Sequence, residues 1–330
     1  MRIGISINGE GRGHITRMTA LADGLKEHGE LFFWASPRDR AGLEGRFRAP
    51  VYNLPPLTVA MNRNRLDLWQ TGKDNLDVLA NTGVYLREQC RRLEEIRPDV
   101  FISDFEPFLA KAAGKCGIPV LQLNHPGIVL RSPSLKPDAV LAKLVAYNMM
   151  GKYDRELISS FYNGDIGPLL RREIREAEPR RGDFLVVYLR DGVDRTVCSA
   201  LNRTGKIRYR TFPGKEWDFT ESLASCRGVI THAGHQLLSE ALSLKKPVLA
   251  FPIEGQYEQR LNARMLETAG WGQAGRLETL EQDLASWLDS LDEFPRKTAG
   301  RDVFRFSDDL DNTLEKVLAF AGGEALRVAS

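Results

Sequence analysis

Cysteine pairs and long apolar runs are both missing from this sequence. Its four cysteines form no CxxC pair and no zinc spacing, so neither a disulfide framework nor a structural zinc site is expected. We expect buried thiols in a reducing compartment instead. These are Cys90, Cys116, Cys198 and Cys226. No apolar run approaches the roughly 20 residues that a membrane-spanning helix needs.

Excess charge is also missing. The 46 basic and 44 acidic side chains give a net charge of +2, so bulk electrostatics do not favour nucleic acid. The first residues become polar too early for a signal peptide, which predicts a cytoplasmic protein, in solution or peripheral at the membrane. The hydrophobic share of 42% is typical of a globular protein with a real core. A length of 330 residues suffices for two domains.

Strand-like apolar segments alternate with helical segments along both halves of the chain. They are residues 2–7, 31–35, 51–54, 100–103 and 120–123, then 184–189, 207–211, 228–231 and 248–251. This alternation predicts an α/β protein with parallel sheets. Two such units are two Rossmann-like domains facing a cleft, with ligands at the carboxyl ends of the strands. We place the domains at 1–165 and 183–305, with a charged, solvated hinge at 166–182 and a final helix within 306–330.

Residues 228–263 gather polar groups at two strand ends. The polar positions, with the glycine among them, are His232, Gly234, His235, Gln236, Glu240, Glu258 and Gln259. A helix that begins after Gly234 offers free N–H groups and a favourable dipole to an anion such as a diphosphate. Glu240, one turn further, can accept hydrogen bonds from ribose hydroxyls, and the Glu258–Gln259 pair can hold sugar hydroxyls. The segment therefore predicts a receptor for a nucleotide-sugar.

The run from His232 to Glu240 resembles the donor-binding signature of GT-B glycosyltransferases. It is similar to the H-C-G-W-N-S-x-x-E core of plant secondary-product glucosyltransferases. It also resembles the matching segment of the bacterial enzymes that build lipid-linked peptidoglycan disaccharide and diacylglycerol glycolipids. The later stretch from Pro252 to Ala263 resembles the P…[DE]-Q-x-x-N-A that closes this signature.

That resemblance implies that His232 and the turn through Gln236 hold the diphosphate, Glu240 the ribose, and Glu258 with Gln259 the transferred sugar. One position departs from the family, because its phosphate-binding Ser or Thr is Leu237 here. Backbone N–H groups or Gln236 would have to replace that contact. The resemblance also implies that the final helix crosses back onto the first domain.

A glycine loop, Asn8-Gly-Glu-Gly11-Arg-Gly13-His14, follows the first strand. It differs from the dinucleotide fingerprint, but Gly11 and Gly13 allow close approach of a ligand or of the partner domain. His14 stands where a helix dipole disfavours imidazolium, so it can take a proton at neutral pH. His14 either caps the helix or serves as a base. The resemblance favours the base, because inverting plant enzymes place theirs just after the first strand.

Further candidates line the other strand ends. Asp104 matches the Asp that orients the base in the plant enzymes and would fix its tautomer; alternatively it caps a helix over Pro107–Lys115, and Glu106 is the second candidate for the orienting role. Arg17, one turn after His14, is expected to approach a donor or acceptor phosphate. His125 either lines the acceptor side or is structural. Arg190 either neutralises the leaving group or forms a surface ion pair.

The irregular stretch 61–70 is either an acceptor-recognition loop, with Arg63, Arg65 and Trp69, or a plain solvated loop. The acceptor stays open among lipid, polysaccharide, small molecule and nucleic acid, as does the oligomeric state.

The sequence favours inverting transfer of a hexosyl group from a UDP or dTDP sugar, with His14 as general base. The resemblance implies no cofactor and no required metal. One alternative is a nucleotide-sugar hydrolase of the pseudaminic-acid pathway type. The motif Gly11-x-Gly13-His14-x-x-Arg17 resembles the opening segment of that enzyme. Others are a sugar-nucleotide 2-epimerase and a catalytically dead sugar-nucleotide-binding subunit.

Overall fold

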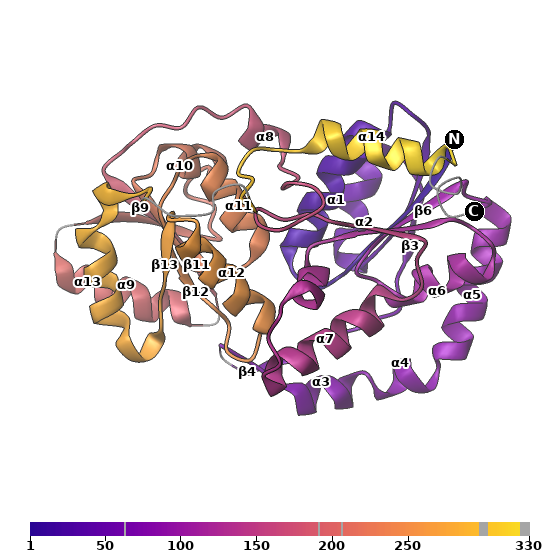
Figure 1. Ribbon diagram of the computed structural model, residues 1–330, viewed down its shortest axis with the longest axis horizontal. Coiled ribbons are helices and arrows are strands. Elements are labelled where there is room, and N and C mark those ends of the chain that lie inside the picture. Colours follow the sequence, from indigo (N-terminus) through magenta and orange to yellow (C-terminus); the bar gives the residue numbers. More distant parts are fainter. Residues whose placement is uncertain (63, 191, 206, 297–302, 324–330) are drawn as a thin grey trace.

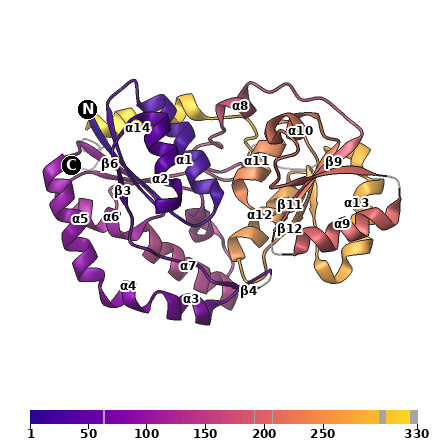
Figure 2. The same cartoon turned by 180° about the vertical axis from the view of Figure 1, so that it is seen from behind.

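The chain forms two α/β halves that lie side by side, each built on a parallel sheet (Figures 1 and 2). The computed structural model describes residues 1–62, 64–190, 192–205, 207–296 and 303–323. Parallel strands are covered by helices on both faces, so they read as nearly continuous apolar runs. This is why five of the six residues of the first strand are buried.

The sheet of the first half has six strands in the order β3-β2-β1-β6-β7-β8, and every pair is parallel. The strands are β1 (Arg2–Ile7), β2 (Glu30–Ala35), β3 (Val51–Asn53), β6 (Val100–Asp104), β7 (Val120–Asn124) and β8 (Arg155–Ile158). The order is that of a doubly wound dinucleotide-binding sheet, in which ligands bind outside the carboxyl ends of the strands.

Helices cover this sheet, and a small arm projects from it. The helices are α1 (Arg12–Leu25), α2 (Pro37–Phe47), α3 (Leu68–Asp74), α4 (Leu76–Ala80), α5 (Thr82–Ile96), α6 (Pro107–Lys115), the 3-10 helix η1 (Pro126–Arg131) and α7 (Pro137–Met150). The arm is an antiparallel pair, β4 (Met61–Asn62) with β5 (Arg65–Leu66). It reaches the second half, because the N–H of Leu66 donates to the carbonyl of Glu254 at 2.9 Å.

The second half has a five-stranded parallel sheet in the order β10-β9-β11-β12-β13. Its strands are β9 (Phe184–Tyr188), β10 (Arg208–Phe212), β11 (Gly228–His232), β12 (Val248–Phe251) and β13 (Gly272–Ala274). Its helices are α9 (Val193–Thr204), α10 (Phe219–Ser225), α11 (His235–Ser243), α12 (Tyr257–Thr268), η2 (Leu277–Thr279), α13 (Leu280–Asp289) and η3 (Leu291–Glu293). The connecting segment holds the short helix α8 (Arg172–Arg175).

The last described helix returns to the first half. Helix α14 (Leu310–Ala321) lies along α1 (Figure 1), and its Leu310, Val317 and Phe320 join the apolar core of the first sheet. Asp309, just before α14, accepts a hydrogen bond from the N–H of Gly167 at 2.6 Å. The segment that leads into α14 therefore connects the start of the linker, at Gly167, to the first half.

All nine strands expected from the sequence are present, and the parallel α/β architecture is confirmed. Four strands were not expected. β4 and β5, of two residues each, lie in the stretch 61–70 that was expected to be irregular. β8 begins with an exposed arginine, and β13 reads Gly-Gln-Ala, so neither is a continuous apolar run. The expectation for the cysteines holds for Cys226, whereas the other three are half-buried. Within the described ranges, no helix has the length and apolarity to span a membrane.

Candidate functional site

The glycine loop places His14 against Asp104. β1 and β6 are paired so that Ile7 lies beside Asp104, and Gly11, with a φ of 80°, turns the chain into α1. Nδ1 of His14 then lies 3.0 Å from Oδ2 of Asp104, which is fully buried. A carboxylate only accepts, so the hydrogen bond puts the imidazole proton on Nδ1 and leaves Nε2 as the basic nitrogen.

Arg17 occupies the other oxygen of the same carboxylate. Its Nη2 donates to Oδ1 of Asp104 at 2.6 Å and lies 3.2 Å from Nδ1 of His14. Burial alone would raise the pKa of Asp104, but the charges of Arg17 and His14 and their hydrogen bonds hold that pKa below its ordinary value. Asp104 therefore stays ionised. The approach of Arg17 to a phosphate stays a prediction, because the structure gives its Nη2 to a carboxylate.

The alternative interpretation of Asp104 as a helix cap is wrong. Glu106 caps α6, with Oε1 accepting from the N–H of Phe108 at 3.0 Å and Oε2 from that of Leu109 at 2.7 Å. These bonds also explain why Glu106 does not orient His14. Burial raises the pKa of Glu106 to about 7, although both backbone hydrogen bonds oppose the shift.

The predicted diphosphate turn lies between β11 and α11. Gly234 is the N-cap of α11 and offers no capping side chain, and a side chain built at Gly234 would meet open space. His232 ties neighbouring strand ends together: Nδ1 lies 3.1 Å from the carbonyl of Phe251, and Nε2 accepts from the N–H of Arg190 at 3.3 Å. Arg190 itself is exposed. The first-turn N–H groups of α11 offer donors to an anion, and neutralisation of the leaving group by Arg190 stays a prediction.

Two predicted donor contacts are engaged by the linker. Glu240 accepts from Nε and Nη2 of Arg171 at 3.0 and 2.9 Å, and its side chain is only 4% exposed. Nε2 of Gln236 donates to the carbonyl of Leu169 at 3.0 Å. Arg171 was expected in a solvated hinge, but a buried carboxylate holds it. Ribose binding by Glu240 stays a prediction, in which ribose and Arg171 share the carboxylate.

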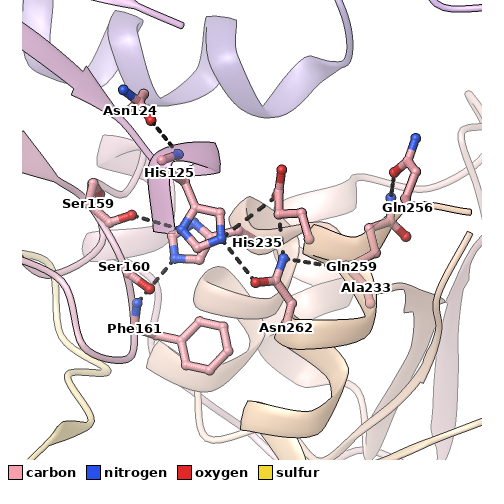
Figure 3. A network of polar contacts seen from close by, with 12 residues as sticks. Asn124, His125, Ser159, Ser160, Phe161, Ala233, His235, Gln256, Gln259 and Asn262 are labelled. Atoms are coloured by element: carbon pink, nitrogen blue, oxygen red, sulfur yellow. Dashed lines mark hydrogen bonds and ion pairs between the residues drawn. The ribbon is translucent and has the colours of Figure 1, made fainter. Parts of the chain in front are cut away.

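Glu258 and Gln259 lie in the first turn of α12, shortly after the end of β12. Oε1 of Gln259 accepts from the N–H of Ile253 at 3.0 Å, and its Nε2 donates to Gln256 at 2.8 Å, so this amide holds the preceding loop (Figure 3). Glu258 is 30% exposed. Burial raises its pKa, while the charges of His14 and Arg17 lower it. Glu258 thus lies within electrostatic reach of the His14 group, on the opposite half.

His125 and His235 meet where the halves join (Figure 3). Their rings stack with centroids 3.6 Å apart, and His235 also stacks on Phe161 at 5.5 Å. Nε2 of His235 accepts from the N–H of Phe161 at 3.1 Å. The ring of His235 is therefore directed into the first half, and its backbone N–H is one of the first-turn donors of α11.

The glycine loop packs directly against the predicted diphosphate turn. A methyl group in place of the hydrogen of Gly13 would lie 3.4 Å from Cβ of Gln236, and α1 contacts α11. The structure thus brings together the candidates of both halves, with His14, Asp104 and Arg17 on one side and the turn of Gly234 with Glu258 on the other. Among the described residues, no group of three or more His, Cys, Asp or Glu side chains could hold a metal ion.

Sequence reasoning missed three participants. Tyr162 and Arg171 carry no motif, because their partners Asn262 and Glu240 are 100 and 69 residues away. Asn262 lies in the stretch from Pro252 to Ala263 that closes the signature. That position indicated a functional role, but none was assigned to Asn262 from the sequence. Of the acceptor-loop candidates, Trp69 is 84% exposed on α3, Arg65 lies 3.5 Å from Glu254, and Arg63 lies outside the described residues.

Two parallel-sheet halves that meet where the glycine loop packs against the turn of Gly234 have the architecture of a GT-B glycosyltransferase. A family model described as glycosyl transferase family 1 matches residues 1–292, so the chain belongs to that family.

Relatives and solved structures agree. An uncharacterized glycosyltransferase of Methanosarcina mazei is 28% identical, covering 82% of this chain and 85% of that protein. Another from Methanosarcina acetivorans is 25% identical, covering 96% and 98%. The calicheamicin glycosyltransferase CalG4 has a TM-score of 0.62 at 16% identity, covering all of both chains. UGT71G1 of Medicago truncatula, solved with UDP-glucose, has a TM-score of 0.63 at 13% identity, covering 96% and 98%.

Proposed function

We propose that this glycosyltransferase moves a hexosyl group from a UDP or dTDP sugar to an acceptor hydroxyl with inversion at the anomeric carbon. Nε2 of His14 takes the hydroxyl proton as the oxygen attacks, and the bond to the nucleoside diphosphate breaks on the opposite face. Asp104 holds the tautomer and stabilises the imidazolium that forms. The first-turn N–H groups of α11 stabilise the departing diphosphate.

One observation carries this proposal. His14 is oriented by a buried, ionised carboxylate at 3.0 Å, and its loop packs against the turn where the helix N-terminus could bind a diphosphate. The base and the leaving group would thus meet at one boundary. Two structural neighbours support the choice of nucleotide, because they were solved with UDP and with UDP-glucose. Metal independence is part of the proposal and predicts full activity in excess EDTA.

Replacement of the base tests the proposal. We expect His14→Ala to lower kcat by a factor on the order of 10² to 10⁴, the usual contribution of a general base, while UDP binding persists. His28→Ala is the matched control, because His28 is exposed just beyond α1. Equal turnover in wild type and His14→Ala, with donor binding intact, would refute the assignment. Rapid release of UDP and free sugar without an acceptor would instead indicate a hydrolase.

A thermal-shift screen against nucleoside diphosphates identifies the nucleotide of the donor. A ligand that binds only the folded state raises Tm in proportion to its saturation. We therefore expect UDP or dTDP to raise Tm more than GDP or ADP. A selective response to GDP or ADP would contradict the proposed donor class.

An acceptor presented at a membrane surface is the final part of the proposal. Large apolar side chains are exposed on α3, α4 and α7, which lie along one side of the first half (Figures 1 and 2). They are Leu68, Trp69, Leu76, Leu79, Val140, Leu141, Leu144, Val145 and Tyr147. Exposed Trp and Tyr among aliphatic side chains suit the membrane–water interface. Co-sedimentation with phosphatidylglycerol vesicles, reduced in Trp69→Ser, is the expected result, whereas a protein that stays in the supernatant would exclude this contact.

A further inference from the structure

The amide of Asn262 joins the two halves at the candidate site (Figure 3). Asn262 lies on α12 and is fully buried. Its Oδ1 accepts from the hydroxyl of Tyr162 at 2.6 Å and lies 3.0 Å from Nε2 of His125. Both of these partners belong to the first half. The other end of the amide stays in the second half, with Nδ2 donating to the carbonyl of Ala233 at 3.0 Å and lying 3.5 Å from Oε1 of Glu258.

The chemistry of these partners determines the orientation of the amide. A carbonyl only accepts, so Nδ2 must face Ala233 and Oδ1 must face the first half. Burial raises the pKa of Tyr162 well above its ordinary value, so the hydroxyl keeps its proton and donates. Ala233 directly precedes the helix cap Gly234, and Glu258 is the expected sugar ligand. One side chain therefore connects the first half to both predicted parts of the donor site.

Aromatic rings exclude water from this junction. His235 is stacked between His125 and Phe161, and Tyr162 meets His125 edge-on at 6.0 Å. Burial lowers the pKa of His125 to about 3 and that of His235 well below its ordinary value, so the two stacked rings are neutral and do not repel each other. Hydrogen bonds in such dry surroundings are stronger than at a surface, and losing one partner is correspondingly costly.

We propose that Tyr162, His125 and Asn262 are positioning residues, which orient Glu258 so that the donor sugar is held only while the two halves are in contact. The inference rests on the proposed function. The diphosphate would bind α11 within the second half alone, whereas the sugar would need the contribution of the first half. The proposal therefore separates binding of the nucleotide from binding of the nucleotide-sugar.

Conservative variants test this separation with UDP and UDP-glucose as probes. Tyr162→Phe removes the hydroxyl and keeps the ring, and His125→Phe keeps a stacked ring without its nitrogens. For each variant we expect an unchanged UDP affinity and a weaker affinity for UDP-glucose. In Tyr162→Phe the loss should be about tenfold, the usual effect of one lost buried hydrogen bond. His125→Phe removes the contact with Asn262 and also the contact of Nδ1 with the Ser159 carbonyl at 3.0 Å, so its loss should be at least as large. Tyr153→Phe is the matched control, because its hydroxyl donates to Glu156 within the first half at 3.3 Å.

Asn262→Asp extends the series, because it also removes the donor to the Ala233 carbonyl. It should weaken UDP and UDP-glucose together. A merely structural role for Tyr162 would weaken both ligands equally in Tyr162→Phe and leave their affinity ratio unchanged. That result, or an unchanged affinity for UDP-glucose, would overturn the proposal.

Amide hydrogen exchange in the ligand-free protein gives a readout that does not depend on the proposed function. We expect faster exchange at residues 256–262 in Tyr162→Phe and His125→Phe, with unchanged exchange at residues 233–236, and no change in Tyr153→Phe. Unchanged protection in both variants would also overturn the positioning role. If the exchange changes as expected but wild type binds neither probe, the proposed UDP donor fails while the link between the halves stands.

Discussion

The substitution Asp104→Asn tests which of two carboxylates, Asp104 or Glu106, orients His14. The substitution keeps the shape of the side chain and removes its charge. Arg17 is 3% exposed and donates to Asp104 at 2.6 Å, so it is left as a buried and unpaired cation. Breaking a buried ion pair in this way costs about 3–5 kcal/mol. We expect the free energy of unfolding to fall by that amount.

Catalysis should suffer separately from stability. Without the carboxylate, His14 loses the partner that holds its proton on Nδ1 and that stabilises the imidazolium. We expect kcat to fall by a factor on the order of 10² to 10⁴, with UDP affinity retained. The assay is UDP release from a donor and acceptor that support wild-type turnover, per folded molecule. Urea unfolding gives the folded fraction.

Glu106→Gln is the matched control for Asp104→Asn. Glu106 is also buried and lies two residues away, but its carboxylate caps α6. A weakened cap costs about 1 kcal/mol, and kcat should be unchanged. The reasoning fails if Glu106→Gln lowers kcat as much as Asp104→Asn, or if Asp104→Asn retains wild-type kcat.

Three further predictions concern stability and thiol chemistry. Burial raises the pKa of Glu106 to about 7, so the folded state binds the proton of Glu106 more tightly than the unfolded state does. The contribution of Glu106 to the free energy of unfolding should therefore fall by about 3 kcal/mol as pH rises from about 4.5 to about 7. Urea titrations of Glu106→Gln should lack this pH-dependent contribution. Gly24→Ala should destabilise the protein by about 1–3 kcal/mol, because the added methyl group would lie 2.5 Å from Leu314 of α14. Gly42→Ala in α2 places its methyl group in open space and should stabilise the protein by about 0.5–1 kcal/mol. Equal thermal shifts for the two variants would contradict the packing of α14 on α1. Burial raises the pKa of Cys226 to about 11, so iodoacetamide at pH 8 should modify it only after unfolding, and rapid labelling of the folded protein would show that it is accessible.

The relation between the two candidate carboxylates shows where sequence reasoning ends. Asp104 is the last residue of β6, Glu106 lies two residues further, and both precede a helix that begins at Pro107. Local patterns leave two assignments open, because either carboxylate can cap a helix at that spacing. The choice depends on Arg17 and His14, which are 87 and 90 residues away and reach only Asp104.

The sequence by itself determined the central strands and the two loop turns, because these depend on local and periodic features. Apolar runs specify the central strands because parallel strands are buried on both faces, and the glycines of the two loops permit a turn at Gly11 and an uncapped helix start at Gly234. Tertiary structure alone decided which side chains pair across the halves: Asn262 with Tyr162, His235 with His125, and Glu240 with Arg171. The physical reason is that a buried polar group must find a partner wherever packing brings one within reach, and neither the partner's identity nor its distance along the chain is written in a local pattern.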